Sequence, residues 1–116
     1  MYDFVKHIDI VVEDDSFENC RLSISTNENH LNRHRMLHGG VLFTLADTAA
    51  GSTAVHDGKY VTMNSSFNFL KSVNSGKIVA TTEVLNKSNK TMVIKVDVTC
   101  EDLLLATGIF TMYKIQ

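Results

Sequence analysis

Residues 34–55 read HRMLHGGVLFTLADTAAGSTAV, and this stretch decides the fold because it stays apolar for about four helical turns after a polar start. It opens on His38-Gly39-Gly40, and Asp47 is the single charged residue between Gly39 and Val55. In an α-helix, successive residues are rotated by about 100° around the axis. This rotation places small and polar residues on one narrow stripe of the helix: Gly40, Thr44, Asp47, Thr48 and Gly51. The rest of the circumference is mostly apolar, so we expect a single curved sheet to enclose this helix.

Alternating apolar and polar residues predict strands on both sides of the helix. Before it, residues 7–12 and 20–26 form a predicted hairpin around a polar turn at 13–19. After it, a meander of four antiparallel strands is predicted at residues 60–70, 77–85, 91–100 and 103–115. The order of two strands, one helix and a meander indicates an α+β fold rather than alternating βαβ units.

The first strand after the helix has two distinct faces. Under strict alternation, Val61, Met63 and Phe67 share one face, and Thr62 lies on the other. If the apolar face fills the core, Thr62 points away from the helix.

The composition favours one domain over residues 1–116. The chain has 116 residues, 44% of them hydrophobic, and no proline or repeat marks a boundary. A formal net charge of -2 gives no basic excess, so a nucleic acid is not an expected partner. There is no run of about 18 apolar residues and no secretion signal, so we expect a soluble, cytoplasmic protein without a membrane partner.

The two cysteines, Cys20 and Cys100, lie far apart and share no metal-ligand spacing. Without an export signal, two reduced and partly buried thiols are favoured over a disulfide. A Cys–His nucleophile pair is a weaker alternative, because neither cysteine has a histidine close by in the sequence.

Asp47 and the glycine pair are the candidate chemistry of the helix. Burial of a charged carboxylate costs free energy unless hydroxyls or water solvate it. A carboxylate on a mostly buried helix therefore either has such partners or is kept for a function. Glycines at a helix N-terminus leave backbone N–H groups open to a ligand, and the helix dipole stabilises developing negative charge there. A polarised carbonyl and a carboxylate base would suit hydrolysis of an ester or thioester. The structural alternative is an Asp47 that is either buried and satisfied by neighbouring hydroxyls or exposed on a stripe that faces solvent.

The spacing of these groups has a consequence for assembly. Gly39 and Asp47 are eight residues apart, about 12 Å along a helix at 1.5 Å per residue, whereas one reacting carbonyl needs its groups within about 3 Å. Two antiparallel copies of the helix could place Gly39 of one copy beside Asp47 of the other. Such a site requires at least a dimer with two equivalent composite sites.

The segment HGGVLFTLADTAAGSTA, residues 38–54, resembles the central-helix signature of the hotdog-fold acyl-CoA thioesterases of the phenylacetate-degradation (PaaI-like) type. The similarity begins at NHLN, residues 29–32, and continues through VTMNSSFNFLKSV, residues 61–73, into the closing strands. It implies a hotdog fold, an antiparallel sheet around one long central helix, in dimers that join their sheets edge to edge and often pair into tetramers. It also implies hydrolysis of an acyl-CoA to the free acid and coenzyme A, with no metal and no cofactor apart from the coenzyme A of the substrate.

The resemblance assigns roles to residues at matching positions. Asp47 matches the acid that activates the hydrolytic water, and Gly39 matches the residue whose N–H polarises the thioester carbonyl. His38 matches a residue that helps to shape that pocket, although its chemistry alone suits a cap or packing role equally well.

Four further residues complete the expected site. Asn32 matches an asparagine near the carbonyl or leaving group, and a turn role is its alternative. Thr62 matches a Ser or Thr that helps to hold the water. Gly40 and Thr48, on the stripe of Asp47, are expected to contact the substrate.

Alternatives remain for the surrounding charges and for the function. Basic side chains suit the phosphates of coenzyme A, and scattered surface charge is the alternative for each candidate: Arg33, His34, Arg35 and Lys71. His56 beside Asp57 is expected to be exposed at a turn. The rival function is a non-catalytic acyl-CoA-binding or sensing module on the same fold, but mere binding gives no reason to bury Asp47. A dehydratase of this fold fits the pattern poorly, and a plain structural domain fits least.

Overall fold

The computed structural model describes residues 4–17 and 20–116, and all elements below lie within them. The helical elements are α1 (Phe4–His7), η1 (Glu28–His30), α2 (Gly39–Ala54) and η2 (Val55–Asp57), where η denotes a 3-10 helix. The strands are β1 (Val11–Asp14), β2 (Arg21–Ser25), β3 (Tyr60–Phe69), β4 (Lys77–Lys87), β5 (Thr91–Cys100) and β6 (Leu103–Lys114). Among the described residues, no helix is long and apolar enough to cross a membrane.

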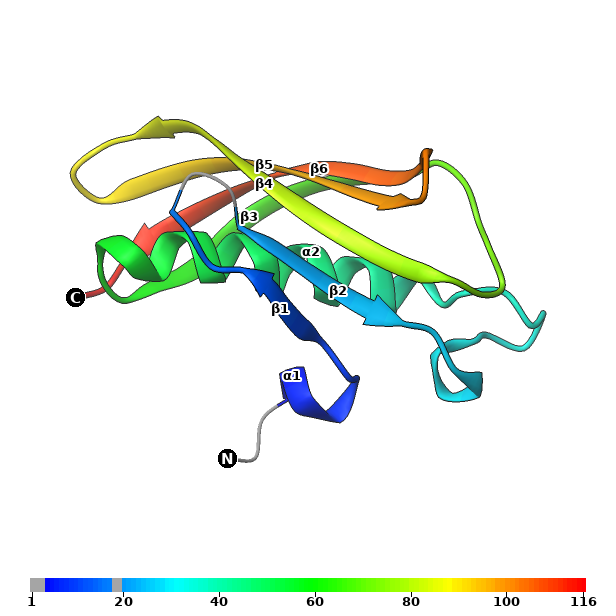
Figure 1. The fold of residues 1–116 in the computed structure, drawn as a ribbon. Helices are drawn as coiled ribbons and strands as arrows, with labels where there is room; N and C mark the ends of the chain where they lie inside the picture. Colours follow the sequence, from blue (N-terminus) through cyan, green and yellow to red (C-terminus); the bar gives the residue numbers. More distant parts are fainter. Residues whose placement is uncertain (1–3, 18–19) are drawn as a thin grey trace.

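The strands form one antiparallel sheet in the order β1-β2-β4-β5-β6-β3. The helix α2 lies along one face of this sheet, and the chain enters it after β2 and leaves it into β3 at the far edge (Figure 1). The predicted architecture, an antiparallel sheet around one long helix, is confirmed. In the described chain β3 pairs with β6 alone, so its other side is a free edge of ten residues.

Two details of the predicted strands are wrong. The strand predicted at 7–12 begins only at Val11, because residues 4–7 form a helical turn and Asp9 has a left-handed backbone with a φ of 68°. The four strands after the helix are not a continuous meander, because β3 pairs with β6 while β4 pairs with β2. Pairing β4 with β2 joins both halves of the chain into one sheet, so that α2 contacts β2 as well as the later strands.

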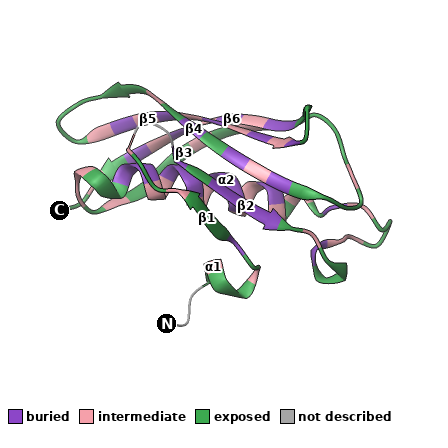
Figure 2. Ribbon diagram, in the orientation of Figure 1, coloured by how far each residue is buried: buried purple, intermediate pink, exposed green. Residues whose placement is uncertain are grey.

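The core lies between α2 and the sheet. Along β5, the buried side chains of Met92, Ile94, Val96 and Val98 alternate with half-buried side chains on the outer face (Figure 2). The helix buries one face made largely of alanine and leucine: Leu42, Leu45, Ala46, Ala49, Ala50, Thr53 and Ala54. Each fully buried large aliphatic side chain contributes about 1.5–3 kcal/mol to folding. On the stripe that carries Asp47, Gly40 is exposed and the other four residues are half-buried.

Asp57 ties the end of η2 to three strands. It accepts hydrogen bonds from the Tyr60 hydroxyl at 2.5 Å and from Nζ of Lys114 at 3.4 Å, and Nζ of Lys87 lies 3.2 Å away. The Tyr60 hydrogen bond, and then the lysines, lower the pKa of Asp57 below its usual value. Burial, and then the contact with Asp57, raises the pKa of Tyr60 to about 12.

Candidate active site

Gly39 is the first residue of α2, and His38 caps the helix. Nδ1 of His38 accepts a hydrogen bond from the Gly40 N–H at 2.8 Å, and the His38 carbonyl accepts from the N–H groups of Val41 and Leu42. The N–H of Gly39 has no partner among the described residues. It lies at the positive end of the helix dipole, where it can donate to a negatively charged oxygen.

Asp47 lies eight residues further along the same helix. The hydroxyl of Thr62 donates a hydrogen bond to Oδ1 of Asp47 at 2.6 Å. Oδ2 has no hydrogen-bond partner within residues 4–17 and 20–116. Asp47 and Thr62 line an open groove of about 570 Å³ between α2 and β3. The carboxylate is therefore fixed through one oxygen and open to solvent through the other.

Strict alternation predicted that Thr62 points away from the helix, but in the structure its side chain faces the helix. It pairs with Met112 of β6, but the register then shifts at Met63, and Phe67 pairs with Gly108. Met112 and Gly108 are both buried on the helix side of β6. The one-residue bulge at Met63 therefore puts Thr62 and Phe67 on the same, helix-facing side of β3.

Asn32 anchors the loop that leads into α2. Its Oδ1 accepts hydrogen bonds from the backbone N–H groups of His34 at 2.8 Å and Met36 at 3.2 Å. This Asx-type turn is the structural alternative for an asparagine in such a loop. A bridge between Leu31 and Leu37 closes the loop before the helix begins. Nδ2 of Asn32 has no partner among the described residues and remains a hydrogen-bond donor.

The predicted site residues form two groups in one chain. At the start of α2 lie Asn32, His38, Gly39 and Gly40, and in the groove lie Asp47, Thr48 and Thr62. Along the helix, Gly39 and Asp47 are about 12 Å apart at 1.5 Å per residue, so one chain does not bring them to a common atom. A side chain at either glycine would make a tight contact: a Cβ on Gly39 would lie 3.3 Å from Phe69 Cε1, and a Cβ on Gly40 would lie 3.0 Å from His38 Nδ1, so the neighbouring ring would have to shift slightly.

Three residues that line the groove were not predicted from the sequence. Beside Asp47, the groove is lined by Val55, Tyr60 and Met112. They come from η2, β3 and β6, and only the fold brings them together. No local pattern in the sequence marks them as groove residues.

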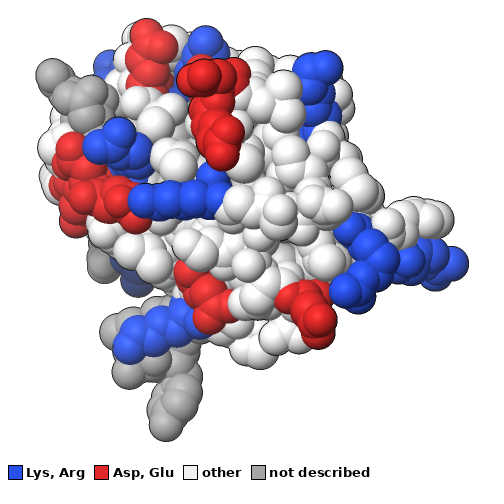
Figure 3. All heavy atoms as spheres, turned by 45° about the vertical axis from the view of Figure 1, so that its right-hand side comes forward, with Lys and Arg blue, Asp and Glu red and all other residues white. Residues whose placement is uncertain are grey.

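The basic residues considered for coenzyme A do not gather into a binding site of their own. The four basic residues considered for coenzyme A are all exposed: Arg33, His34, Arg35 and Lys71. Figure 3 shows basic and acidic side chains interspersed on one face, with uncharged surface between them. His56 contacts Asp15, with Nε2 at 3.3 Å from Oδ1, and it is exposed, as predicted.

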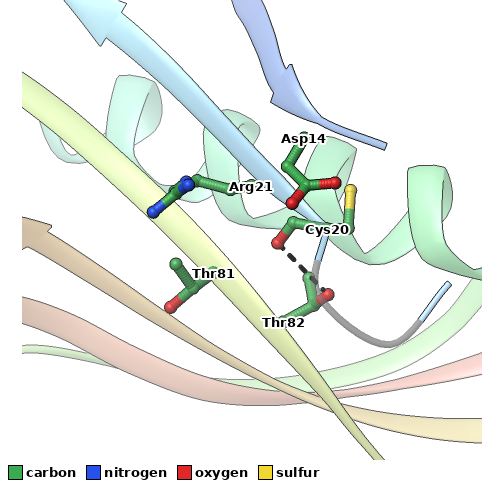
Figure 4. Close-up of a pocket in the computed structure, with 5 residues that line it drawn as sticks. All are labelled: Asp14, Cys20, Arg21, Thr81 and Thr82. Carbon is green, nitrogen blue, oxygen red and sulfur yellow. Dashed lines mark hydrogen bonds between the residues drawn. The ribbon is translucent and has the colours of Figure 1, made fainter. Parts of the chain in front are cut away.

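Another hollow, of about 340 Å³, is lined by Asp14, Cys20, Arg21, Thr81 and Thr82 (Figure 4). Cys20 and Cys100 are both free, as predicted, and both are buried rather than partly buried. Burial raises the pKa of the Cys20 thiol, which disfavours the nucleophilic thiolate. In the described part of the chain, no three His, Cys, Asp or Glu side chains converge to hold a metal ion.

A six-stranded antiparallel sheet wrapped along one long helix is the architecture of a hotdog domain. The thioesterase superfamily matches residues 34–107. This match covers more than half of the chain, which therefore belongs to that superfamily.

Individual relatives extend this similarity. A protein of Archaeoglobus fulgidus named "Putative esterase" is 29% identical over 100 residues, covering 84% of this chain and 65% of the relative. The chain thus spans about 65% of the length of that curated relative. A protein of Streptococcus pneumoniae described as a hypothetical thioesterase, solved with coenzyme A, is 27% identical with a TM-score of 0.84, covering 90% of this chain and 87% of the other. The phenylacetic acid degradation protein PaaI of Thermus thermophilus, in a mutant form, shares the fold at 23% identity with a TM-score of 0.92, covering 97% and 98%.

Proposed function

We propose that the protein is an acyl-CoA thioesterase, which hydrolyses an acyl-CoA to a free acid and coenzyme A. The observation that carries this proposal is the carboxylate of Asp47, held at Oδ1 by Thr62 and open at Oδ2 toward a groove. A carboxylate with one fixed and one open oxygen is suited to remove a proton from water. Membership of the thioesterase superfamily, and a similar protein solved with coenzyme A, support a coenzyme A thioester as the substrate.

The chemistry requires two copies of the chain, and two features support a dimer. The free edge of β3 offers unpaired N–H and C=O groups to a second copy. A two-fold axis that brings Gly39 of one α2 to Asp47 of the other must pass near Phe43, midway between them. Phe43 packs against Phe67 of β3 with ring centroids 5.5 Å apart. The same two-fold axis can therefore bring together the α2 helices and the β3 edge strands of the two copies.

In this composite site, the thioester oxygen accepts a hydrogen bond from the Gly39 N–H of one copy. Asp47 of the other copy removes a proton from water as the water oxygen attacks the carbonyl carbon. The C–S bond then breaks, and the coenzyme A sulfur leaves with the proton that Asp47 accepted. Direct attack by the Asp47 carboxylate, giving an anhydride that water hydrolyses, uses the same residues.

The remaining residues shape the pocket for the carbonyl. His38 holds the first turn of α2 through its cap, and Nδ2 of Asn32 can donate a second hydrogen bond to the thioester or the leaving group. Thr62 keeps Oδ2 of Asp47 aimed at the water, while Gly40 and Thr48 contact the substrate.

The test is hydrolysis of a panel of short, aromatic and long acyl-CoAs, followed with a thiol reagent. We expect Asp47→Asn to lower kcat/KM by about 10²–10⁴-fold, the usual contribution of a general base. Asp102→Asn is the matched control, because Asp102 is exposed in the β5–β6 turn, and it should leave the rate unchanged. Tight binding of acyl-CoA without turnover would instead identify a binding or sensing module.

A further inference from the structure

His30 is a buried histidine that the proposed mechanism does not use. It is the last residue of η1, and only 2% of its surface is exposed. Its Nδ1 accepts a hydrogen bond from the Asn27 N–H at 3.1 Å, which completes a capping box around η1. Burial of so polar a ring needs a compensating contact on its other nitrogen as well.

That contact comes from the N-terminal part of the chain. Nε2 of His30 lies 3.2 Å from Oδ2 of Asp9, although no described residue makes a well-aligned hydrogen bond to it. The same Oδ2 accepts a hydrogen bond from Nδ2 of Asn27 at 3.2 Å. Because Nδ1 is an acceptor, a neutral His30 carries its proton on Nε2, facing the Asp9 carboxylate.

The backbone of His30 continues the connection into the proposed site. Its carbonyl accepts a hydrogen bond from the His38 N–H at 2.8 Å. His38 caps α2, and the next residue carries the free Gly39 N–H. A displacement of η1 would therefore move the helix cap and, with it, the amide that polarises the carbonyl.

We propose that His30 is a positioning residue of the thioesterase site: its Nε2–H tautomer, held between Asn27 and Asp9, fixes η1 and thereby the Gly39 amide. The proposal rests on the thioesterase function proposed above. A small error in the position of a reacting group costs up to about 100-fold in rate. Because the Gly39 N–H stabilises charge that develops in the transition state, the loss should fall on kcat rather than on KM.

The kinetic test compares His30→Ala with His30→Gln in the full-length protein. Glutamine at the third position of a capping box supplies the acceptor that alanine lacks. We expect His30→Ala to lower kcat by about 10- to 100-fold with a KM within about threefold of wild type. His30→Gln should restore most of that loss. A wild-type kcat in His30→Ala, or a kcat in His30→Gln as low as in His30→Ala, would overturn the proposal.

Two NMR measurements test the same idea without any turnover. In the wild-type protein at neutral pH, the nitrogen shifts of His30 should identify Nε2 as protonated and Nδ1 as unprotonated. Exchange of the His38 amide hydrogen should be slow in wild type and His30→Gln, and at least tenfold faster in His30→Ala. A wild-type Nδ1–H tautomer would contradict the proposal even if the enzyme is active. A protein that hydrolyses no acyl-CoA but gives both expected NMR results would overturn the function and leave the His30 arrangement standing.

Discussion

Gly39 occupies a helix position at which a single atom, its amide hydrogen, can be removed without disturbing the backbone. Proline is favoured at the first position of a helix, where its missing N–H breaks no helical hydrogen bond. His38, with φ of −67° and ψ of 134°, already has the extended backbone that a residue before proline adopts. The N–H of Gly39 can therefore be tested apart from the fold.

We expect Gly39→Pro to lower kcat by about 100-fold, the loss typical of one oxyanion-hole donor. Gly39→Ala is the matched control, because it adds the same Cβ beside the Phe69 ring but keeps the N–H. Phe69 is exposed and can move aside, so Gly39→Ala should stay within about threefold of wild type. Steady-state kinetics with one acyl-CoA decide the matter, and equal losses in the two variants would point to crowding instead.

Individual residues differ in how far the sequence alone could place them. The half-buried position of Asp47 was predictable, because the helical period fixes which residues share a stripe. The contact between Thr62 and Asp47 was not, because it depends on the bulge at Met63. A bulge is a property of the pairing between two strands, so one strand's alternation does not reveal it.

Among the elements, η2 and the start of β3 depend on one carboxylate. The pKa of Asp57 is lowered, first by the hydrogen bond from Tyr60 and then by the lysines. An acid whose folded pKa lies below its unfolded value stabilises the fold above the unfolded pKa. This stability is lost as the pH falls below 3.8, the ordinary value for Asp57, and through the lower folded value.

Asp57→Asn should therefore lower the melting temperature by about 2–4 °C at pH 7. The difference from wild type should narrow as the pH falls below 3.8, because the carboxyl of Asp57 takes up a proton first in the unfolded chain and then, at lower pH, in the folded protein. Thermal unfolding of both proteins between pH 2.5 and 7 (roughly the span over which an aspartate titrates) measures this. The Asp102→Asn protein provides the baseline, and a gap that stays constant with pH would contradict the ion-pair explanation.

The elements themselves were predicted unevenly. The helix over residues 39–54 and the last three strands follow local periodicity closely. The neighbour of β3 was predicted wrongly, because pairing between strands far apart in the sequence leaves no mark on either strand alone. The start of the first strand was also predicted wrongly, because the sequence pattern did not reveal the left-handed backbone at Asp9. The strand β1 therefore begins at Val11 and not at residue 7.

At the level of the whole molecule, the proposed chemistry depends on a second copy, because Gly39 and Asp47 lie on one rigid helix. The free edge of β3 and the open groove beside Asp47 leave room for that copy. A cis site and a trans site differ in one respect that can be measured. If the site lies in one chain, a chain defective in either residue is inactive whatever its partner.

A heterodimer of one Gly39→Pro chain and one Asp47→Asn chain separates these cases. Each homodimer should be nearly inactive, since every site lacks one of the two groups. In the heterodimer, the intact Gly39 of one chain faces the intact Asp47 of the other, so one of two sites works. We expect about half of the wild-type kcat per dimer, because symmetry makes the two sites equivalent. Co-expression with two different affinity tags yields the heterodimer, and acyl-CoA hydrolysis measures it. If each site instead lies within one chain, every site of the heterodimer lacks either the Gly39 N–H or the Asp47 carboxylate. A heterodimer as inactive as the two homodimers would therefore exclude the composite site.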